Sequence, residues 1–242
     1  MQNLYQIHKS RSGILFLLSG PAGSGKSTLL KRALEEFDNM KFSISCTTRT
    51  PREGEVNGKE YHFLNNDEFT SKVENDEFLE HAIVHKWNYG TLKSSVKEAL
   101  ESGVDIIMDI DVQGAQQVRE CQDSVISNAL VDIFITTKGV SELESRLRGR
   151  GSEDDETFEL RMVTAKSELE EWNHYTYYII SGTPEDDFSV LSSIINSEFI
   201  KLGSKPVLYK PLPNVSPIGM PTKQLSFPAL SKKGASVVFP ID

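Results

Sequence analysis

The clearest chemistry in the sequence lies in residues 20–27, which read Gly-Pro-Ala-Gly-Ser-Gly-Lys-Ser. This run matches G-x-x-x-x-G-K-[ST], a loop whose backbone N–H groups hold phosphate oxygens at the positive end of the following helix. Lys26 is expected to reach the β- and γ-phosphates of a nucleoside triphosphate, and Ser27 to ligate Mg²⁺. The expected phosphate contacts are Gly20, Pro21, Ala22, Gly23, Ser24, Gly25, Lys26, Ser27 and Thr28.

Two acids close the apolar run at residues 104–110, namely Asp109 and Asp111. An acid at the carboxyl end of a central strand, beside a phosphate loop, commonly organises Mg²⁺ through water or contacts the substrate. An isolated Asp at a strand end is more often a turn or cap residue. The neighbouring phosphate loop favours the functional interpretation, with Asp109 near the metal through a water molecule.

The phosphate loop must be positioned by a strand before it and a helix after it. Residues 13–19 form a short continuous apolar run, which is typical of a strand buried on both faces of a parallel sheet. Residues 26–37 carry apolar side chains at helical spacing. A flexible Gly-Ser-Gly loop without a ligand is the alternative, and this strand-loop-helix context argues against it.

The same alternation continues along the chain. Apolar runs at residues 104–110 and 130–135 predict two more buried strands. Helical spacing predicts helices over residues 92–101, 140–147, 156–175 and 188–202. Strands that alternate with helices predict an α/β fold with a doubly wound parallel sheet.

Residues 42–86 have a different pattern. Short β-like pieces occur at residues 42–48 and 60–64, a turn is predicted at Asn57-Gly58, and a short helix around residues 67–73. We expect a small subdomain inserted between the first and the later strand-helix units.

Composition limits the class of protein. With 38% hydrophobic and 25% charged residues among 242, the chain fits an ordinary globular protein with a packed core. The net charge of −9 argues against a general nucleic-acid binder, because phosphate backbones require clustered Lys and Arg. No signal peptide or membrane anchor is expected, and two cysteines are too few for a disulfide framework. The expected location is cytoplasmic, with no nucleic acid and no membrane as partner.

The composition changes from residue 203 onward. Residues 203–242 hold seven of the ten prolines, five lysines and one acid, so that the rest of the chain carries a net −13. Proline removes a backbone donor and restricts the residue before it, so no regular element is expected. We expect an extended or disordered tail whose partner the sequence leaves unknown.

The acceptor of the phosphoryl group is indicated by the inserted segment. Residues 45–63, from Ser-Cys-Thr-Thr-Arg to Tyr-His-Phe, resemble the GMP-binding segment of the guanylate kinase family almost residue for residue. The match continues in order with Phe-Leu-Glu at 78–80, Asn-Tyr-Gly-Thr at 88–91 and Asp-Ile-Asp-Val-Gln-Gly at 109–114. The resemblance covers about residues 12–200.

The resemblance implies a P-loop protein with three α/β/α layers, a parallel core sheet, an inserted GMP-binding subdomain and a mobile lid. The implied boundaries are a guanylate kinase-like domain at 1–202 and the Pro/Lys-rich tail at 203–242. Within the domain they are a core at 12–41 and 92–202, a GMP-binding subdomain at about 42–91 and a lid at about 143–161.

The resemblance also implies the acceptor site. Arg49, Arg52, Tyr61 and Tyr89 would hold the GMP phosphate, since guanidinium groups bind phosphate oxygens in bidentate fashion. Glu80 would read guanine, because a carboxylate accepts from its N1–H and 2-amino donors. Taken singly, Glu80 could be a solvated helix acid and the arginines surface charges. The complete implied GMP set is Ser45, Arg49, Arg52, Tyr61, Glu80, Tyr89, Thr91, Asp109, Asp111 and Gly114.

Residues 145–156 look like the lid of nucleoside monophosphate kinases, whose arginines close over the triphosphate. Arg146, Arg150 and Arg161 match family positions, whereas a solvated basic turn is the better interpretation for Arg148. Positioned cations suit phosphoryl transfer, because negative charge spreads over the transferring oxygens. The implied catalytic residues are Lys26, Arg49, Arg146, Arg150 and Arg161.

One stretch departs from the family. Guanylate kinases usually carry a Val-Asn-Asp type segment after the last strand, with the asparagine near the adenine ring. Here the stretch from Tyr178 to Gly182 places Ser181 at that position. The amide contact to adenine is therefore absent from this sequence.

The function that the resemblance implies is Mg²⁺-dependent transfer of the γ-phosphate of ATP to GMP, or to dGMP, giving ADP and the nucleoside diphosphate. Two alternatives remain open. Guanylate kinase-like domains of scaffold proteins bind peptides, but they have lost the phosphate loop that is intact here. A monophosphate kinase for another acceptor, such as AMP or dTMP, is opposed by Glu80 and by the segment from Arg49 to Tyr61.

Overall fold

The core of the molecule is a five-stranded parallel sheet in a computed structural model that describes residues 11–84, 86–149 and 155–202. The strand order is β2-β7-β1-β8-β9, and every neighbouring pair is parallel. The strands are β1 (Leu15–Ser19), β2 (Met40–Phe42), β7 (Asp105–Asp109), β8 (Leu130–Thr137) and β9 (Tyr177–Ser181). The predicted doubly wound parallel sheet is confirmed.

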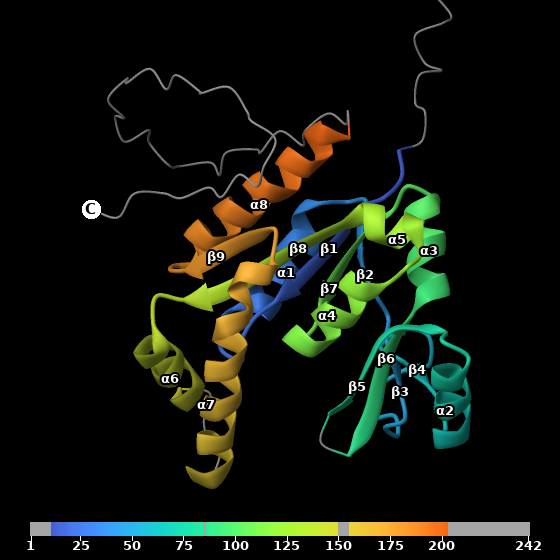
Figure 1. The fold of residues 1–242 in the computed structure, drawn as a ribbon, viewed down its shortest axis with the longest axis horizontal. Helices are drawn as coiled ribbons and strands as arrows, with labels where there is room; N and C mark the ends of the chain where they lie inside the picture. The colour runs from blue at the N-terminus through green and yellow to red at the C-terminus, as the bar shows by residue number, and fades with distance from the viewer. Residues whose placement is uncertain (1–10, 85, 150–154, 203–242) are drawn as a thin grey trace, which may run out of the picture.

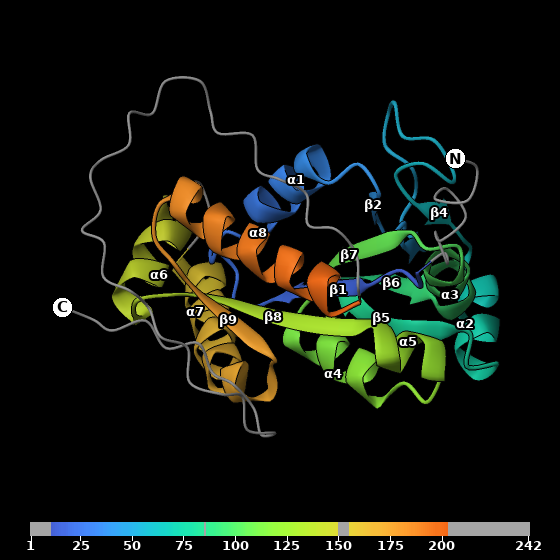
Figure 2. The ribbon, with the colours of Figure 1, turned by 90° about the horizontal axis from the view of Figure 1, so that it is seen from above.

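Helices cover both faces of this sheet (Figure 2). One face carries α1 (Lys26–Glu36) and α8 (Pro184–Lys201), and the other carries α3 (Lys93–Glu101), α4 (Val112–Glu120) and α5 (Ser124–Ala129). Successive residues of β1 point to opposite faces. Phe16 and Leu18 join the α1 and α8 side, and Leu15 and Leu17 join the α3 to α5 side. This is why the first apolar run is continuous rather than alternating.

A second sheet of four strands holds the inserted segment. Its order is β4-β3-β6-β5, with β3 (Cys46–Thr47), β4 (His62–Phe63), β5 (Phe78–Val84) and β6 (Trp87–Leu92). Helix α2 (Asn66–Glu74) packs on it through Phe69, whose ring is stacked 4.5 Å from that of Phe78. Asn65 and Glu68 form a reciprocal capping box that begins α2.

Two further helices form a third part of the molecule, α6 (Val140–Arg148) and α7 (Asp155–Leu169), and α7 continues into the 3-10 helix η1 (Glu170–His174). They have an apolar cluster of their own, made of Leu143, Leu147, Phe158, Met162 and Ala165. In Figure 1 these helices and the second sheet both lie below the core sheet, with α7 at the lower left and the second sheet at the lower right.

Several predicted boundaries were wrong. The β-like piece at residues 42–48 is split, because Phe42 ends β2 in the core sheet whereas Cys46 and Thr47 form β3 in the second sheet. The helix predicted to end at residue 175 is α-helical only to Leu169. Helix α8 begins four residues earlier than predicted, with Pro184 in its first turn and the Thr183 side chain as its cap.

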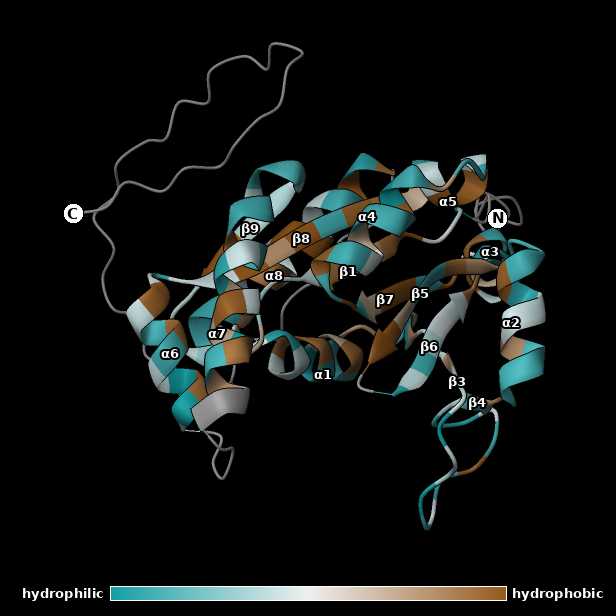
Figure 3. Ribbon diagram, turned by 60° about the horizontal axis from the view of Figure 1, so that its bottom comes forward, coloured by the Kyte–Doolittle hydropathy of each residue, from teal (hydrophilic) through white to brown (hydrophobic). Residues whose placement is uncertain are grey.

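Figure 3 shows apolar residues concentrated in the core strands and polar residues on the outer surfaces of the helices. Among the described residues, no helix is both long and apolar enough to span a bilayer. The predicted tail at residues 203–242 lies outside the described residues.

Candidate active site

The phosphate loop connects β1 to α1 in a conformation that requires glycine. Gly20, Gly23 and Gly25 have φ angles of 133°, 87° and 105°, in the region that side chains disfavour. A Cβ atom on Gly20 would stand 2.1 Å from the carbonyl oxygen of Ile135 on β8. The N–H of Ser24 donates to the Pro21 carbonyl at 3.2 Å, and α1 begins directly after Gly25. The predicted strand-loop-helix arrangement is confirmed, and the N-terminus of α1 opens at the loop.

Lys26 folds back over this loop. Its ammonium group donates to the carbonyl oxygens of Gly20 at 2.7 Å and Pro21 at 3.2 Å. The side chain therefore lies along the loop that would receive phosphates, where a cation favours binding of a polyphosphate.

Glu168 on α7 is a residue that the sequence reasoning missed. Its burial raises the pKa of its carboxyl group to about 7, while Lys26 lowers that pKa and Asp111 raises it. An acid on α7 thus interacts electrostatically with Lys26 of the phosphate loop and with Asp111, which follows β7. Arg161 and Glu168 are seven residues apart, two helical turns, and this spacing is the signal that could have pointed to Glu168.

The two predicted acids at the end of β7 have different partners. The hydroxyl of Ser27 donates to Asp109 Oδ2 at 3.1 Å. Asp111 is the N-cap of α4 and accepts from the backbone N–H of Gly114 at 2.8 Å. A Cβ atom on Gly114 would lie 3.4 Å from Glu80 Oε2. The start of α4 therefore joins the phosphate-loop side of the molecule to the second sheet.

The Ser27 and Asp109 pair fits a hard cation. Mg²⁺ prefers oxygen ligands and is usually held by one or two protein groups together with substrate phosphates and water. A hydroxyl and a carboxylate oxygen at 3.1 Å supply such groups beside the loop. The described residues contain no cluster of three or more His, Cys, Asp or Glu that could hold a metal ion without a substrate.

Glu80 is a buried strand residue, so the alternative of a solvated helix acid was wrong. It lies on β5 opposite Thr91 on β6, and 6% of its surface is exposed. Burial raises the pKa of Glu80, hydrogen bonds from Thr91 lower it, and Asp111 raises it. The hydroxyls of Ser45 and Thr91 are 3.3 Å apart. The structure thus brings Ser45, Glu80 and Thr91 together in a polar cluster, of which the Glu80 carboxylate is the buried charge.

A second group on the same sheet is cationic and aromatic. Arg49 is 8% exposed, and its guanidinium lies 5.4 Å from the ring centre of Tyr61, which in turn contacts Tyr89 at 5.8 Å. Arg52 is exposed on the adjoining turn. The predicted phosphate-binding residues therefore share one end of the second sheet, with Arg49 the most enclosed.

Glu55 is another residue that the sequence reasoning missed. Its Oε1 atom accepts from Arg49 Nη2 at 2.8 Å, and its Oε2 atom accepts from the backbone N–H of Arg52 at 2.7 Å. This pairing raises the pKa of Arg49 and lowers that of Glu55. The Arg-x-x-Glu spacing of a tight turn is the signal that could have revealed this contact.

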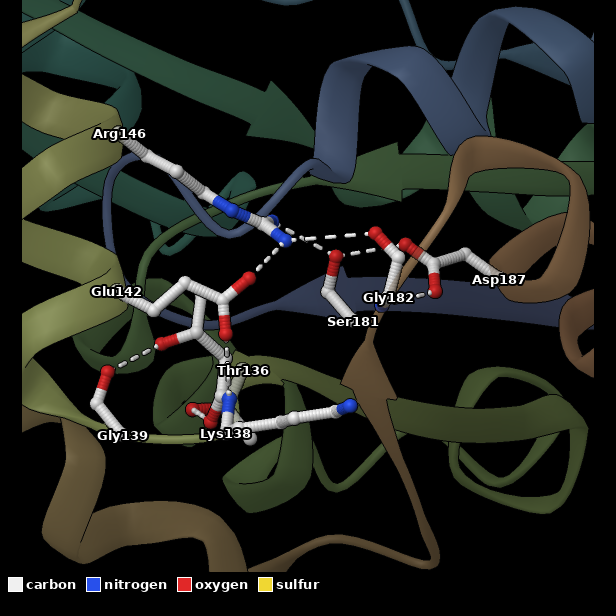
Figure 4. Close-up of polar contacts among 9 residues, drawn as sticks. Thr136, Lys138, Gly139, Glu142, Arg146, Ser181, Gly182 and Asp187 are labelled. Atoms are coloured by element: carbon white, nitrogen blue, oxygen red, sulfur yellow. Dashed lines mark hydrogen bonds and ion pairs between the residues drawn. The ribbon is translucent and has the colours of Figure 1, made fainter.

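Among the predicted lid arginines, Arg146 has the most extensive described contacts. Arg146 on α6 reaches β9 and donates to the Ser181 hydroxyl at 2.8 Å and to Glu142 at 2.6 Å (Figure 4). Arg161 lies on α7 and is half-buried. Arg148 is the last residue of α6, pairs with Glu144 and covers the ring of Phe158, so it lies on a helix and not in the solvated basic turn that was predicted. Arg150 lies outside the described residues.

Cys46 lies on β3 of the second sheet and is fully buried. Burial raises the pKa of its thiol to about 11, so that the reactive thiolate is scarce at neutral pH. The structure therefore favours an inert buried thiol at this position.

Known proteins with the same arrangement are guanylate kinases. A family model described as guanylate kinase matches residues 12–198. A guanylate kinase of Clostridium perfringens (strain SM101 / Type A) is 41% identical over 194 residues, covering 80% of this chain and 87% of its own. One of Maricaulis maris (strain MCS10) is 43% identical over 191 residues, covering 79% and 86%. The crystal structure of guanylate kinase from Anaplasma phagocytophilum matches with a TM-score of 0.59 and 30% identity, over 78% of this chain and 87% of that one.

Proposed function

This chain belongs to the guanylate kinase family, whose members are ATP:GMP phosphotransferases. From this membership we propose which of its residues bind ATP, which bind GMP and which stabilise the γ-phosphoryl group during its transfer to GMP. An oxygen of the GMP phosphate attacks the γ-phosphorus while the bond to the β-phosphate oxygen breaks, giving GDP and ADP. The transferring group carries spread negative charge, so catalysis depends on positioning and on cations.

The donor side is assigned to the phosphate loop. Among residues 20–28, the backbone N–H groups of residues other than Pro21, which has none, bind the phosphates together with the positive end of α1, and Lys26 contacts the β- and γ-phosphates. Its bonds to the Gly20 and Pro21 carbonyls support this, because they hold the ammonium over the loop. Ser27 and Asp109 would hold Mg²⁺ together with the phosphates, Asp109 through water. When bound, the ion would neutralise charge on the β- and γ-phosphate oxygens.

The acceptor side is assigned to the second sheet. Arg49 and Arg52 bind the GMP phosphate with the hydroxyls of Tyr61 and Tyr89, and Glu55 fixes the orientation of Arg49. Glu80 accepts from the guanine N1–H and 2-amino groups, with Ser45 and Thr91 beside it. Asp109 at the end of β7 and Asp111 and Gly114 at the start of α4 complete this side, and Gly114 adjoins Glu80.

The lid supplies positive charge to the transferring phosphoryl group. We assign this role to Arg146 on α6, to Arg161 on α7 and to Arg150, which lies between these helices in the sequence. The domain assignment follows the same division: core at 12–41 and 92–202, GMP-binding subdomain at about 42–91, lid at about 143–161 and tail at 203–242. We assign the reaction to the cytoplasm, a reducing compartment that suits the free thiols Cys46 and Cys121, with no nucleic-acid or membrane partner.

The observation that carries the choice of acceptor is the burial of Glu80 opposite Thr91. A buried carboxylate can accept from two adjacent donors, and guanine presents such a pair whereas adenine does not. Substitution Glu80→Gln replaces one acceptor oxygen with an amide donor, which opposes one guanine donor. We expect the KM for GMP to rise about 10- to 100-fold, as for one unpaired buried polar group, with the KM for ATP unchanged.

Initial rates measured with each substrate varied in turn test this expectation. The exposed Glu74→Gln on α2 is the matched control and should leave both KM values unchanged. An equal rise of both KM values in Glu80→Gln, or none, would show that Glu80 does not read the acceptor base.

A further inference from the structure

A buried serine at the end of β9 joins the lid to the core. Ser181 is 2% exposed, and its hydroxyl donates to Asp187 Oδ2 at 2.6 Å. The Ser181 hydroxyl oxygen also accepts a hydrogen bond from Arg146 Nη1 at 2.8 Å (Figure 4). A hydroxyl has one proton to donate and two lone pairs to accept with, and here both kinds of bond are used.

Asp187 fixes the direction of that hydroxyl. This carboxylate is 6% exposed, lies in the first turn of α8, and accepts with its other oxygen from the Gly182 N–H at 2.7 Å. The positive end of α8 stabilises its charge. Because an ionised carboxylate can only accept, the Ser181 proton must point toward Asp187 and a lone pair toward Arg146.

The rest of the guanidinium is also held. Arg146 Nη2 donates to Glu142 on its own helix at 2.6 Å and approaches the Gly182 carbonyl at 3.5 Å. A guanidinium carries five N–H donors in a rigid plane, so that three contacts fix its orientation and leave donors for phosphate oxygens.

The place where Arg146 is held adjoins the phosphate loop. A Cβ atom on Gly25 would lie 3.7 Å from the Ser181 hydroxyl oxygen, and one on Gly23 would lie 3.3 Å from the Leu147 side chain of α6. The helix that carries Arg146 and the serine that binds it therefore both touch the loop. Because Arg146 is bonded to that serine, its guanidinium is held beside the phosphate loop.

We propose that Ser181 is a positioning residue for phosphoryl transfer, which holds the guanidinium of Arg146 beside the phosphate loop with its own hydroxyl oriented by Asp187. The proposal rests on the role of Arg146 proposed above. It assigns Ser181 and Asp187 to the donor side through the lid arginine rather than through a contact with the base of ATP.

The test is a set of initial-rate measurements on Ser181→Ala and Ser181→Thr. The alanine variant removes the bond to Arg146, and we expect kcat to fall roughly tenfold, as for one hydrogen bond to a charged group, with the KM for GMP unchanged. Threonine keeps a hydroxyl and should restore most of kcat. The exposed Ser193→Ala on α8 is the matched control and should retain wild-type kinetics.

A double-mutant cycle with Arg146→Ala separates positioning from a structural role. If Ser181 acts through Arg146, Ser181→Ala causes no further loss of kcat in the Arg146→Ala background. Additive losses, or a higher kcat in Ser181→Ala, would overturn the proposal. A lower melting temperature with unchanged kcat would also overturn it, since that pattern reports packing alone.

Asp187→Asn tests the orientation of the hydroxyl. An amide nitrogen facing Ser181 would turn the serine proton toward Arg146, so that two donors would meet. We expect a loss of kcat similar to that of Ser181→Ala, and wild-type kinetics would contradict the role of Asp187. If the wild-type enzyme transfers phosphate to GMP but Arg146→Ala leaves kcat unchanged, the lid assignment fails while the family function stands.

Discussion

Arg49 and Glu80 are the two buried charges of the proposed acceptor site, and they differ in their hydrogen-bond partners. Arg49 is paired with Glu55 at 2.8 Å, so that its charge is balanced before any ligand arrives. Glu80 is hydrogen-bonded by the side chain and the backbone of Thr91 rather than by a cation, and burial raises its pKa. A buried carboxylate without a counter-charge is costly, and guanine donors would relieve that cost. Affinity for the base should therefore depend on Glu80 more than on any other acceptor residue.

Glu168 gives a prediction on stability against pH. Its pKa in the folded protein is about 7, above the ordinary value of 4.5 that it takes in the unfolded chain. Between pH 4.5 and 7 the folded state keeps a proton that the unfolded state has lost, so the contribution of Glu168 to stability falls as pH rises. Glu168→Gln does not titrate, and its unfolding free energy should therefore rise relative to wild type across this window and level off above pH 7.

Urea midpoints of both proteins at pH 5, 6, 7 and 8 measure this difference. Glu159→Gln, an exposed position on the same helix, controls for the loss of a charge from α7. A difference between Glu168→Gln and wild type that stays constant from pH 5 to 8 would show that Glu168 has an ordinary pKa in the folded enzyme.

Residues that belong to a local motif could be predicted from the sequence, and residues that act across the fold could not. The phosphate loop is a contiguous pattern, and its strand and helix were visible as periodicity. Ser181 was recognised only as a departure from the family. Its bond to Arg146 joins positions 35 residues apart and depends on how α6 packs beside β9. Glu168 likewise became notable only through its burial and its electrostatic interaction with Lys26 in the folded chain.

The lid helices form an element with its own packing. Their cluster of Leu143, Leu147, Phe158, Met162 and Ala165 is separate from the two clusters on the faces of the core sheet. An element with a separate cluster can open locally while the core stays folded. This property suits a lid that must admit and release nucleotides.

Phe158→Ala tests that independence. Removing a buried phenyl ring costs about 3 kcal/mol, which in a local unit corresponds to roughly a hundredfold faster amide exchange. We expect this acceleration in α6 and α7, with β1 and β8 unchanged, in hydrogen exchange followed by mass spectrometry. The exposed Val163→Ala on α7 should exchange like wild type. Equal acceleration in β1 and β8 would show that the lid and the core unfold as one unit.

The strands of the second sheet were the least predictable elements. β3 and β4 have two residues each and are fixed by pairing with longer neighbours. β5 and β6 carry Glu80, His81, Asn88 and Thr91, which interrupt the apolar pattern that indicates a strand. α4 and α5 were missed as well, being short and interrupted by glycine and polar residues. Functional residues on an element weaken the periodicity by which it is predicted.

At the scale of the whole molecule, the donor and acceptor groups occupy different sheets. The phosphate loop follows β1, and Asp109 and Ser181 are the last residues of β7 and β9. All three lie at the carboxyl ends of core strands, where ligands of parallel α/β sheets bind. Arg49, Tyr61 and Glu80 lie on the second sheet, which meets the core at Gly114 and Glu80. In the proposed assignment the two substrates bind to separate parts of one chain, and the start of α4 connects these parts.

The central claim is that this chain transfers the γ-phosphate of ATP to GMP at these two groups of residues. The most direct measurement is ADP release with Mg·ATP and each of GMP, AMP, CMP, UMP and dTMP, with Lys26→Ala assayed in parallel. We predict turnover with GMP alone, reduced at least a hundredfold in Lys26→Ala because the phosphate-loop cation is lost. Turnover with another acceptor in preference to GMP, or measurable GMP binding without turnover, would contradict the account.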